Sequence, residues 1–278
     1  MQRRNDGSYV EIGELKTWYD EQGEGEPLVL LHGGISTNET WGAQMPDFGA
    51  RFRVTAPERR GHGHTPDLEG PMSYDVMAND TIGFLEAVVG NPAHLIGWSD
   101  GGIVGLLIAM ARPDLVRKLV VIGANFDPSG IVPQAMQGLT SMTAGSDDLA
   151  VFRTPYEAAS PDGPEHWPIV FAKFQKMVST QPNITHEQLG QISAPTLVLA
   201  GDDDMISLEH TSALYNAIPN SELAVVPGTS HALLMEKPDL VNQLVLDFLE
   251  KDPPKTFMPL RRQSALTTSK RRHPVSRS

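Results

Sequence analysis

The 278-residue sequence predicts an α/β fold whose mostly parallel sheet is flanked by helices. Two observations support this prediction. Short apolar runs, several of which end at glycine, alternate with longer stretches whose apolar residues recur at helical spacing. Hydrophobic residues make up 40% of the chain, which is enough for one sizeable core. The sequence therefore favours a single large domain over residues 1–252.

The expected elements follow one another along the chain. Residues 8–12 (SYVEI) and 15–23 (LKTWYDEQG) have the pattern of a strand hairpin with a glycine exit. Strands are expected at the apolar runs EPLVLL, RFRVTAPE, AHLIGW, RKLVVIGA, APTLVLAG and ELAVVPG. The first two have the pattern of strands buried on both faces. Helices are expected over residues 75–89, 102–112, 207–217 and 238–251.

The pattern changes between about residues 127 and 190. Pro, Gly and Ser are mixed there with short helical pieces, and large apolar residues recur throughout. A simple linker would lack those apolar residues. We therefore interpret residues 127–190 as a small helical cap inserted into the domain.

Charge is unevenly distributed along the chain, whose formal net charge is −12. Residues 251–278 contain eight of the 22 basic residues and one of the 34 acidic residues, so the preceding body is strongly acidic. An acidic body repels phosphate backbones, which argues against nucleic acid as a partner. The basic, Ser- and Thr-rich segment 253–278 is expected to be a disordered tail.

Several features bear on the compartment. No apolar run reaches the roughly 20 residues that a membrane-spanning helix needs, so no membrane association is expected. The first residues, MQRRNDGSYVE, lack the apolar segment of a secretory signal. Cysteine is absent, which excludes disulfides, a thiol nucleophile and thiolate metal ligands. These features predict a cytoplasmic protein, and they leave monomer and homodimer open.

The segment GWSDGG, residues 97–102, lies between a predicted strand and a predicted helix. A strand, a sharp turn and a helix form the context of a nucleophile elbow. Gly97 and Gly101 stand two residues on either side of Ser99, where larger side chains would collide. The pattern G-x-S-x-G arises by chance in glycine-rich chains, but its context makes Ser99 a candidate nucleophile.

A serine hydroxyl needs a base within hydrogen-bond reach, and the base needs an orienting carboxylate. Among nine histidines, His231 follows a predicted strand and precedes the last predicted helix. The stretch LVLAGDDDMIS supplies three aspartates, residues 202–204, at the end of the preceding strand. The order serine, aspartate, histidine is the chain order of folds with a nucleophile elbow.

Acyl transfer also requires N–H donors for the oxyanion. One donor is expected from Asp100, the residue after the nucleophile. The second is expected from His32-Gly33-Gly34, which follows the apolar run LVLL. A glycine at position 34 allows the backbone to approach the substrate oxygen closely.

Taken together, these motifs resemble those of bacterial α/β-hydrolases. The similarity runs from about residue 9 to 250 and includes LLHGG, APERRGHGHT, GWSDGG, the GAN turn, LAGDDD and GTSHALLMEKPD in family order. GWSDGG followed by GAN is most similar to the valacyclovir hydrolase (biphenyl hydrolase-like) group and to small bacterial esterases. The resemblance implies that Ser99 is the nucleophile, His231 the base, and Asp204, at the end of the G-x-x-D motif, the acid. Gly34 and Asp100 would supply the oxyanion amides.

The segment APERRGHGHT contains the two departures from the family pattern. Glu58 stands where Asp is usual, and Thr65 stands where Ser is usual; the resemblance gives this loop a structural role. His62 and His64 have no third ligand close by in the sequence, so no metal is expected.

The function implied by the resemblance is hydrolysis of a small carboxylic ester through an acyl-enzyme, without cofactor or metal. In valacyclovir hydrolase-like enzymes the acid that matches Asp100 is associated with the α-amino group of the substrate, which leaves amino-acid esters as an alternative. Lactones and a non-catalytic ligand-binding role are further alternatives. Trp98 and Trp167 are candidates for the substrate pocket, and ordinary core packing would explain either residue equally well.

Overall fold

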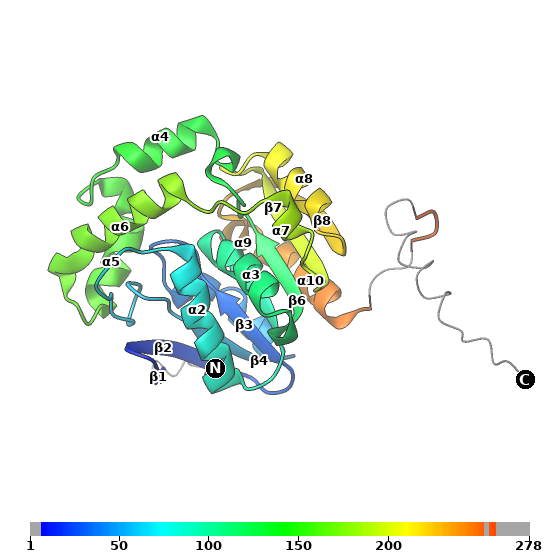
Figure 1. Ribbon diagram of the computed structural model, residues 1–278, viewed down its shortest axis with the longest axis horizontal. Coiled ribbons are helices and arrows are strands. Elements are labelled where there is room, and N and C mark those ends of the chain that lie inside the picture. Colours follow the sequence, from blue (N-terminus) through cyan, green and yellow to red (C-terminus); the bar gives the residue numbers. More distant parts are fainter. Residues whose placement is uncertain (1–6, 253–255, 260–278) are drawn as a thin grey trace, which may run out of the picture.

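A computed structural model describes residues 7–252 and 256–259 of the chain. Within these residues, eight strands form one sheet in the order β1-β2-β4-β3-β5-β6-β7-β8 (Figure 1). The predicted tail, residues 253–278, lies outside the described residues except for 256–259. The strands are β1 (Ser8–Ile12), β2 (Leu15–Gln22), β3 (Pro27–Leu31), β4 (Arg53–Pro57), β5 (Ala93–Trp98), β6 (Val116–Ile122), β7 (Thr196–Asp203) and β8 (Ser221–Ser230).

The sheet is antiparallel only at one edge. The hairpin β1–β2 turns at Gly13, which has a φ of +59°, and β2 then pairs antiparallel with β4. All later pairs, from β4–β3 to β7–β8, are parallel. The mostly parallel sheet expected from the alternating pattern is thus confirmed.

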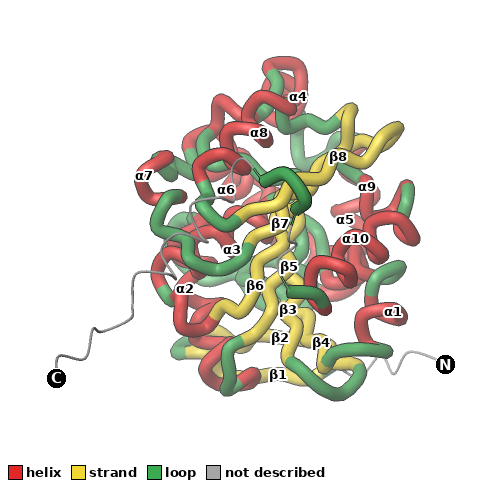
Figure 2. The backbone as a smooth tube through the Cα atoms, turned by 90° about the vertical axis from the view of Figure 1, so that its right-hand side faces the viewer, coloured by secondary structure: helices red, strands yellow, loops and turns green. Residues whose placement is uncertain are grey.

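Helices cover both faces of the twisted sheet (Figure 2). On one face lie α2 (Tyr74–Phe84), α3 (Asp100–Ala111), α7 (His186–Leu189) and α8 (Leu208–Ala217). On the other face lie α1 (Met45–Gly49), α9 (Leu233–Glu236) and α10 (Pro238–Glu250). The predicted helix 75–89 is observed as α2 followed by a π-helical turn, Leu85–Val89, which ends at Gly90.

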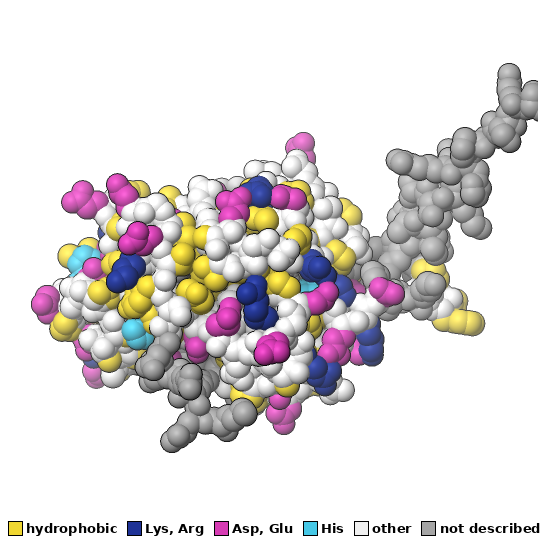
Figure 3. Space-filling model, turned by 90° about the horizontal axis from the view of Figure 1, so that it is seen from below, with side chains coloured by type: hydrophobic (Ala, Val, Ile, Leu, Met, Phe, Trp, Pro, Cys, Tyr) yellow, Lys and Arg dark blue, Asp and Glu magenta, His cyan; other side chains and the backbone are white. Residues whose placement is uncertain are grey.

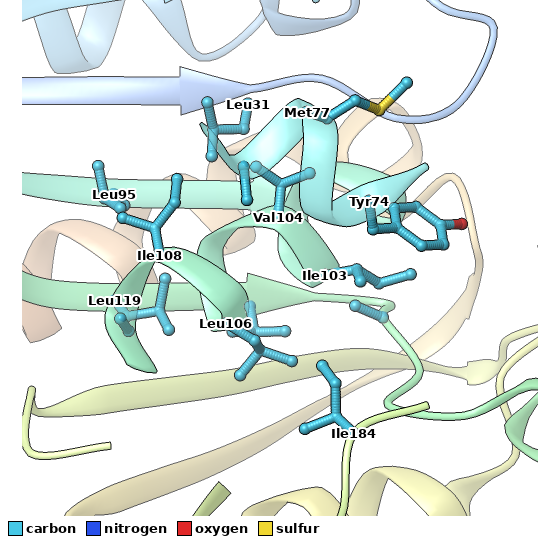
Figure 4. Packing of buried hydrophobic residues seen from close by; sticks show 14 of the residues in the cluster. Leu31, Tyr74, Met77, Leu95, Ile103, Val104, Leu106, Ile108, Leu119 and Ile184 are labelled. Atoms are coloured by element: carbon cyan, nitrogen blue, oxygen red, sulfur yellow. The ribbon is translucent and has the colours of Figure 1, made fainter. Parts of the chain in front are cut away.

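Strand alternation divides the core into two halves. Val29 and Leu31 of β3 face the α2–α3 side, and Leu28 and Leu30 face the α1–α10 side. Figure 4 shows strand residues Leu31, Leu95 and Leu119 in contact range of residues from α2 and α3. Both faces of the central strands are therefore apolar, which explains why they read as continuous hydrophobic runs.

The segment between β6 and β7 carries α4 (Pro133–Ser141), α5 (Ala150–Ala159) and α6 (Trp167–Thr180). Figure 1 shows these helices gathered at one end of the molecule, away from α10. The Asp67 carboxylate links α6 to the main domain. It accepts hydrogen bonds from Lys173 Nζ at 2.6 Å and from His166 Nε2 at 2.9 Å. This arrangement is consistent with the predicted cap over residues 127–190.

On the surface, Figure 3 shows acidic and basic side chains interspersed with apolar ones over one face of the molecule. None of the helices in the described part of the chain is long and apolar enough to cross a membrane. The cytoplasmic location and the choice between monomer and homodimer stay predictions.

The turn between β5 and α3 brings backbone atoms very close together. Ser99 has φ +54° and ψ −121°, a backbone conformation that is rare for residues other than glycine. A Cβ at Gly97 would lie 2.1 Å from the Gly101 carbonyl oxygen, and a Cβ at Gly101 would lie 2.0 Å from the Leu31 carbonyl oxygen. The two glycines are required because backbone packs directly against backbone here.

Replacement of Gly97 by alanine is expected to lower the free energy of unfolding by about 1–3 kcal/mol or more, since the opposing backbone atoms cannot rotate away. Urea unfolding followed by circular dichroism measures this change. Gly138→Ala in α4 is the matched control, because a Cβ there meets nothing within 4 Å and should leave stability unchanged or slightly higher. Equal stability of Gly97→Ala and the parent protein would contradict the steric account.

Candidate functional site

Three side chains from distant parts of the sequence form a hydrogen-bonded line at the carboxyl ends of the parallel strands. Ser99 follows β5, Asp204 follows β7 and His231 follows β8. The His231 Nε2 atom lies 3.0 Å from Ser99 Oγ, and His231 Nδ1 lies 2.7 Å from Asp204 Oδ1. The structure thus brings together the three residues that the sequence predicted as a triad.

The three adjacent aspartates, residues 202–204, differ in exposure and in hydrogen-bond partners. Asp202 and Asp203 are exposed, and Asp202 accepts a hydrogen bond from the Thr229 backbone N–H. The Asp204 side chain is fully buried, and its Oδ1 also accepts from the Ile206 N–H at 3.0 Å. Only Asp204 of the three contacts His231, as expected from the G-x-x-D motif.

Gly123 is a site residue that the sequence analysis missed. It follows β6 with a φ of +55°, and a Cβ there would lie 3.1 Å from both Asp204 Oδ2 and His231 Nδ1. A side chain at this position would press on the carboxylate–imidazole pair. The sequence offered one indication of its role: Gly123 begins the GAN turn directly after a predicted strand.

A cavity of about 170 Å³ includes Ser99 and His231 in its wall. Most of its lining is apolar, and much of it comes from the segment between β6 and β7. Its apolar lining includes Ile35, Leu139, Leu149, Phe152, Phe174 and Met205. The candidate nucleophile, Ser99, therefore faces a confined and mainly apolar space, which is typical of small-molecule sites.

The two tryptophans predicted for the pocket have different positions. Trp98 lines the cavity, and its Nε1 donates to the His231 carbonyl oxygen at 2.9 Å, which holds the histidine loop. Trp167 is not among the cavity residues, so its predicted substrate-binding role is corrected. It is 2% exposed, donates to the Ala144 carbonyl oxygen and stacks near Tyr156 and Phe171. The large aromatic residues at helical spacing in α6 are part of the hydrophobic core on the α2–α3 side of the sheet.

Asp100 lines the same cavity and is 5% exposed. Tyr74 Oη donates to its Oδ1 at 2.8 Å, whereas Oδ2 has no hydrogen-bond partner among the described residues. Burial raises the pKa of Asp100, and the nearby Arg59 charge and the Tyr74 hydrogen bond oppose that shift. Nothing in the sequence distinguishes Tyr74, which begins α2, as a partner of this acid.

Gly34 lies beside Ser99 in the cavity wall. A Cβ at Gly34 would lie 2.4 Å from Phe174 Cε2 and 2.6 Å from Asp100 Oδ2, so a larger residue does not fit. The two predicted oxyanion residues, Gly34 and Asp100, are therefore close neighbours.

The histidines of the loop RRGHGHT are hydrogen-bonded within the protein. His62 Nε2 accepts from the Ile35 N–H at 3.0 Å, and His64 Nδ1 contacts Glu58 at 2.9 Å. Glu58 is buried and also accepts from the Asn38 and His64 N–H groups. In the described ranges, no group of three His, Cys, Asp or Glu side chains is placed to hold a metal ion.

Comparisons with known proteins agree with the predicted resemblance. The mouse (Mus musculus) serine hydrolase BPHL is 28% identical over 253 residues, which cover 87% of this chain and 85% of that protein. The 2-hydroxy-6-oxo-2,4-heptadienoate hydrolase of Pseudomonas putida is 30% identical over 270 residues, covering 87% and 96%. The solved structure of Est816, described as an N-acyl homoserine lactone degrading enzyme, superposes with a TM-score of 0.69 at 26% identity, covering 87% and 100%.

A family model, that of the alpha/beta hydrolase family, matches residues 28–244, which contain Ser99, Asp204 and His231. The match extends over most of the chain and includes all the strands from β4 to β8. The α/β-hydrolase fold predicted from the motifs is confirmed, and the chain belongs to the alpha/beta hydrolase family.

Proposed function

We propose that this chain is a serine hydrolase that cleaves carboxylic esters through an acyl-enzyme. One observation carries the proposal: the line of hydrogen bonds from Asp204 through His231 to Ser99 ends at an apolar cavity. Nucleophile, base and orienting carboxylate within hydrogen-bond reach are the arrangement that activates a serine hydroxyl. The similarity to serine hydrolase BPHL supports the same chemistry.

The acylation step follows from this geometry. Ser99 Oγ attacks the ester carbonyl carbon while His231 Nε2 takes the hydroxyl proton, and the carbonyl π-electron pair moves onto the oxygen. The N–H groups of Gly34 and Asp100 bind the resulting oxyanion. As the tetrahedral intermediate collapses, the bond to the leaving oxygen breaks and His231 gives its proton to the departing alcohol.

Deacylation repeats the sequence with water. His231 takes a proton from water, the hydroxide oxygen bonds to the acyl carbon, and the bond to Ser99 Oγ breaks as the serine regains its proton. Asp204 accepts from Nδ1–H, which leaves the Nε2 lone pair directed at Ser99 and stabilises the imidazolium formed in each half-reaction.

The charges around the cavity bear on the acyl group. Asp100 and Asp148 are in the cavity wall, and no Lys or Arg is among its lining residues in the part of the chain described. A carboxylate on the substrate would meet these two acids, and no cation of the cavity wall would pair with it. The pocket therefore suits neutral or cationic esters and lactones better than anionic substrates. A 2-hydroxy-6-oxo-2,4-heptadienoate, for which the Pseudomonas putida relative is named, is such an anion.

Amino-acid esters are a second candidate class, because one observation favours them. Asp100 Oδ2 is buried, has no hydrogen-bond partner among the residues that the structure describes, and belongs to a residue of the cavity wall. An ammonium group on the substrate would give this oxygen a partner and would add to the stabilisation of the carboxylate by the nearby Arg59 charge.

Ser99→Ala is expected to lower kcat for p-nitrophenyl acetate by about 10³-fold or more and to abolish labelling by a fluorophosphonate, since no other group replaces the attacking oxygen. A stopped or continuous absorbance assay and a fluorescent label measure both effects. Persistence of turnover and labelling in this variant would exclude the mechanism. A parent protein that neither labels nor turns over any ester would instead favour the non-catalytic ligand-binding role.

Asp204→Asn should lower kcat by about 10²–10⁴-fold, because an amide no longer fixes the productive tautomer of His231. Asp203→Asn is the matched control: the neighbouring acid is exposed and makes no contact with His231, so kcat should be unchanged. Equal losses in both variants would show that the acid has been assigned to the wrong aspartate.

If amino-acid esters are the substrates, kcat/KM for phenylalanine benzyl ester should exceed that for benzyl 3-phenylpropanoate. Asp100→Asn should reduce this preference by about 10–100-fold, since hydrogen bonds to charged groups contribute about 1.5–3 kcal/mol. The preference should also decline as pH is lowered through the raised pKa of Asp100, where its carboxylate becomes protonated. No preference in the parent protein would leave simple esters or lactones as the class.

A further inference from the structure

The backbone carbonyl of Gly33 accepts hydrogen bonds from three buried side chains. His32 Nδ1 lies 2.7 Å from this oxygen, Ser36 Oγ 2.9 Å and Arg59 Nη2 3.0 Å. His32, Ser36 and Arg59 all have exposed fractions below one tenth. A carbonyl oxygen has two lone pairs, so three donors, one of them cationic, saturate it. Holding a loop in place would not require so many donors.

The protonation of His32 follows from its second nitrogen. The Arg59 backbone N–H donates to His32 Nε2 at 3.1 Å, so Nε2 acts as the acceptor and Nδ1 carries the proton that is donated to Gly33. Burial, followed by the charge of Arg59, lowers the pKa of His32 well below its usual value. The ring is therefore neutral in one defined tautomer.

Arg59 itself is a buried cation. Burial lowers its pKa to about 10, so the guanidinium stays charged at neutral pH. Its Nε and Nη1 atoms have no hydrogen-bond partner among the described residues. No salt bridge to Arg59 is present in that part of the chain. Its Nη2 atom donates to the Gly33 carbonyl oxygen, and its charge also interacts with the nearby Asp100 carboxylate.

The Gly33 carbonyl and the Gly34 N–H are opposite ends of one trans peptide group. Fixing the carbonyl oxygen therefore fixes the direction of the N–H. The next residue is also held, because the Ile35 N–H donates to His62 Nε2 at 3.0 Å while Ile35 has a φ of +45°. The peptide that presents Gly34 beside Ser99 is thus clamped on both sides.

We propose that Arg59, together with Ser36 and His32, positions and polarises the Gly33–Gly34 peptide so that the Gly34 N–H is a strong oxyanion donor. A cation at the carbonyl end of an amide draws electron density toward that oxygen and strengthens the N–H at the other end. Arg59 is a positioning residue, because it acts through the peptide and does not line the cavity. This inference rests on the proposed ester hydrolysis and assigns a role to a residue outside the triad.

The experiment compares Arg59→Met and Ser36→Ala with the parent enzyme. Arg59→Met should lower kcat for p-nitrophenyl acetate by about 10–100-fold, less than the roughly 10²–10³-fold typical for loss of a whole oxyanion donor. Ser36→Ala should lower kcat by about threefold to tenfold, since it removes one neutral donor of the three. KM should stay within about twofold in both variants, because the interaction strengthens only as the oxyanion forms.

A transition-state analogue separates this role from a merely structural one. With 1,1,1-trifluorooctan-2-one, Ser99 Oγ adds to the ketone carbon while its proton passes to His231 Nε2 and the carbonyl π-electron pair moves onto the oxygen, which creates an oxyanion without a leaving group. Its inhibition constant should rise in each variant by the same factor as kcat/KM falls. Arg53→Met is the control, since Arg53 also donates to a backbone carbonyl, that of Val89, away from the cavity; both constants should be unchanged.

The outcomes are distinguishable. If Arg59→Met fails to fold by circular dichroism, Ser36→Ala carries the test, because its side chain is small. Active variants with unchanged inhibition constants, or a fall in kcat without a matching rise in the inhibition constant, would overturn the role of this cluster and leave the ester hydrolase proposal intact. A parent enzyme that hydrolyses no ester would overturn both.

Discussion

The close backbone approach at the β5–α3 turn is the constraint on which the rest of the site depends. Because Gly101 rests against the Leu31 carbonyl, the end of β3, the end of β5 and the start of α3 meet within van der Waals distance. Ser99 is held in a strained conformation at this junction. The strain is supported by a core that is apolar on both faces of the sheet, so the turn cannot relax without disrupting central strands.

The charged groups on the two sides of the candidate nucleophile, Ser99, differ in sign. In front lies an apolar cavity whose only charged wall residues in the described chain are acids, Asp100 and Asp148, beside His231. Behind the Gly33–Gly34 peptide lies the buried cation of Arg59. In the proposed mechanism these charges have different roles. The cation behind the amides strengthens anion binding at one point, and the carboxylates in the cavity wall disfavour anionic acyl groups.

The sequence predicted most of the fold because its signals are local. Alternating apolar runs and helical spacing locate the strands and helices, and the glycines around Ser99 reflect a turn that a side chain would obstruct. Trp167 was wrongly expected in the pocket, because the sequence indicates that an apolar residue in a helix is buried but not which residues pack around it. Tyr74 and Gly123 were missed because their importance lies in contacts with Asp100 and with the Asp204–His231 pair, far away in the chain.

By itself, the sequence determined the alternation of strands and helices, the elbow around Ser99 and the order of the candidate triad, because each can be predicted from short motifs of neighbouring residues and from the order of those motifs along the chain. Only the tertiary structure decided which of three adjacent aspartates contacts His231, which tryptophan lines the cavity and where Arg59 directs its charge. These depend on distances between segments far apart in the chain; Ser99 and His231, for example, are 132 residues apart. Such distances are set by the packing of the whole sheet and its helices, which no local pattern specifies.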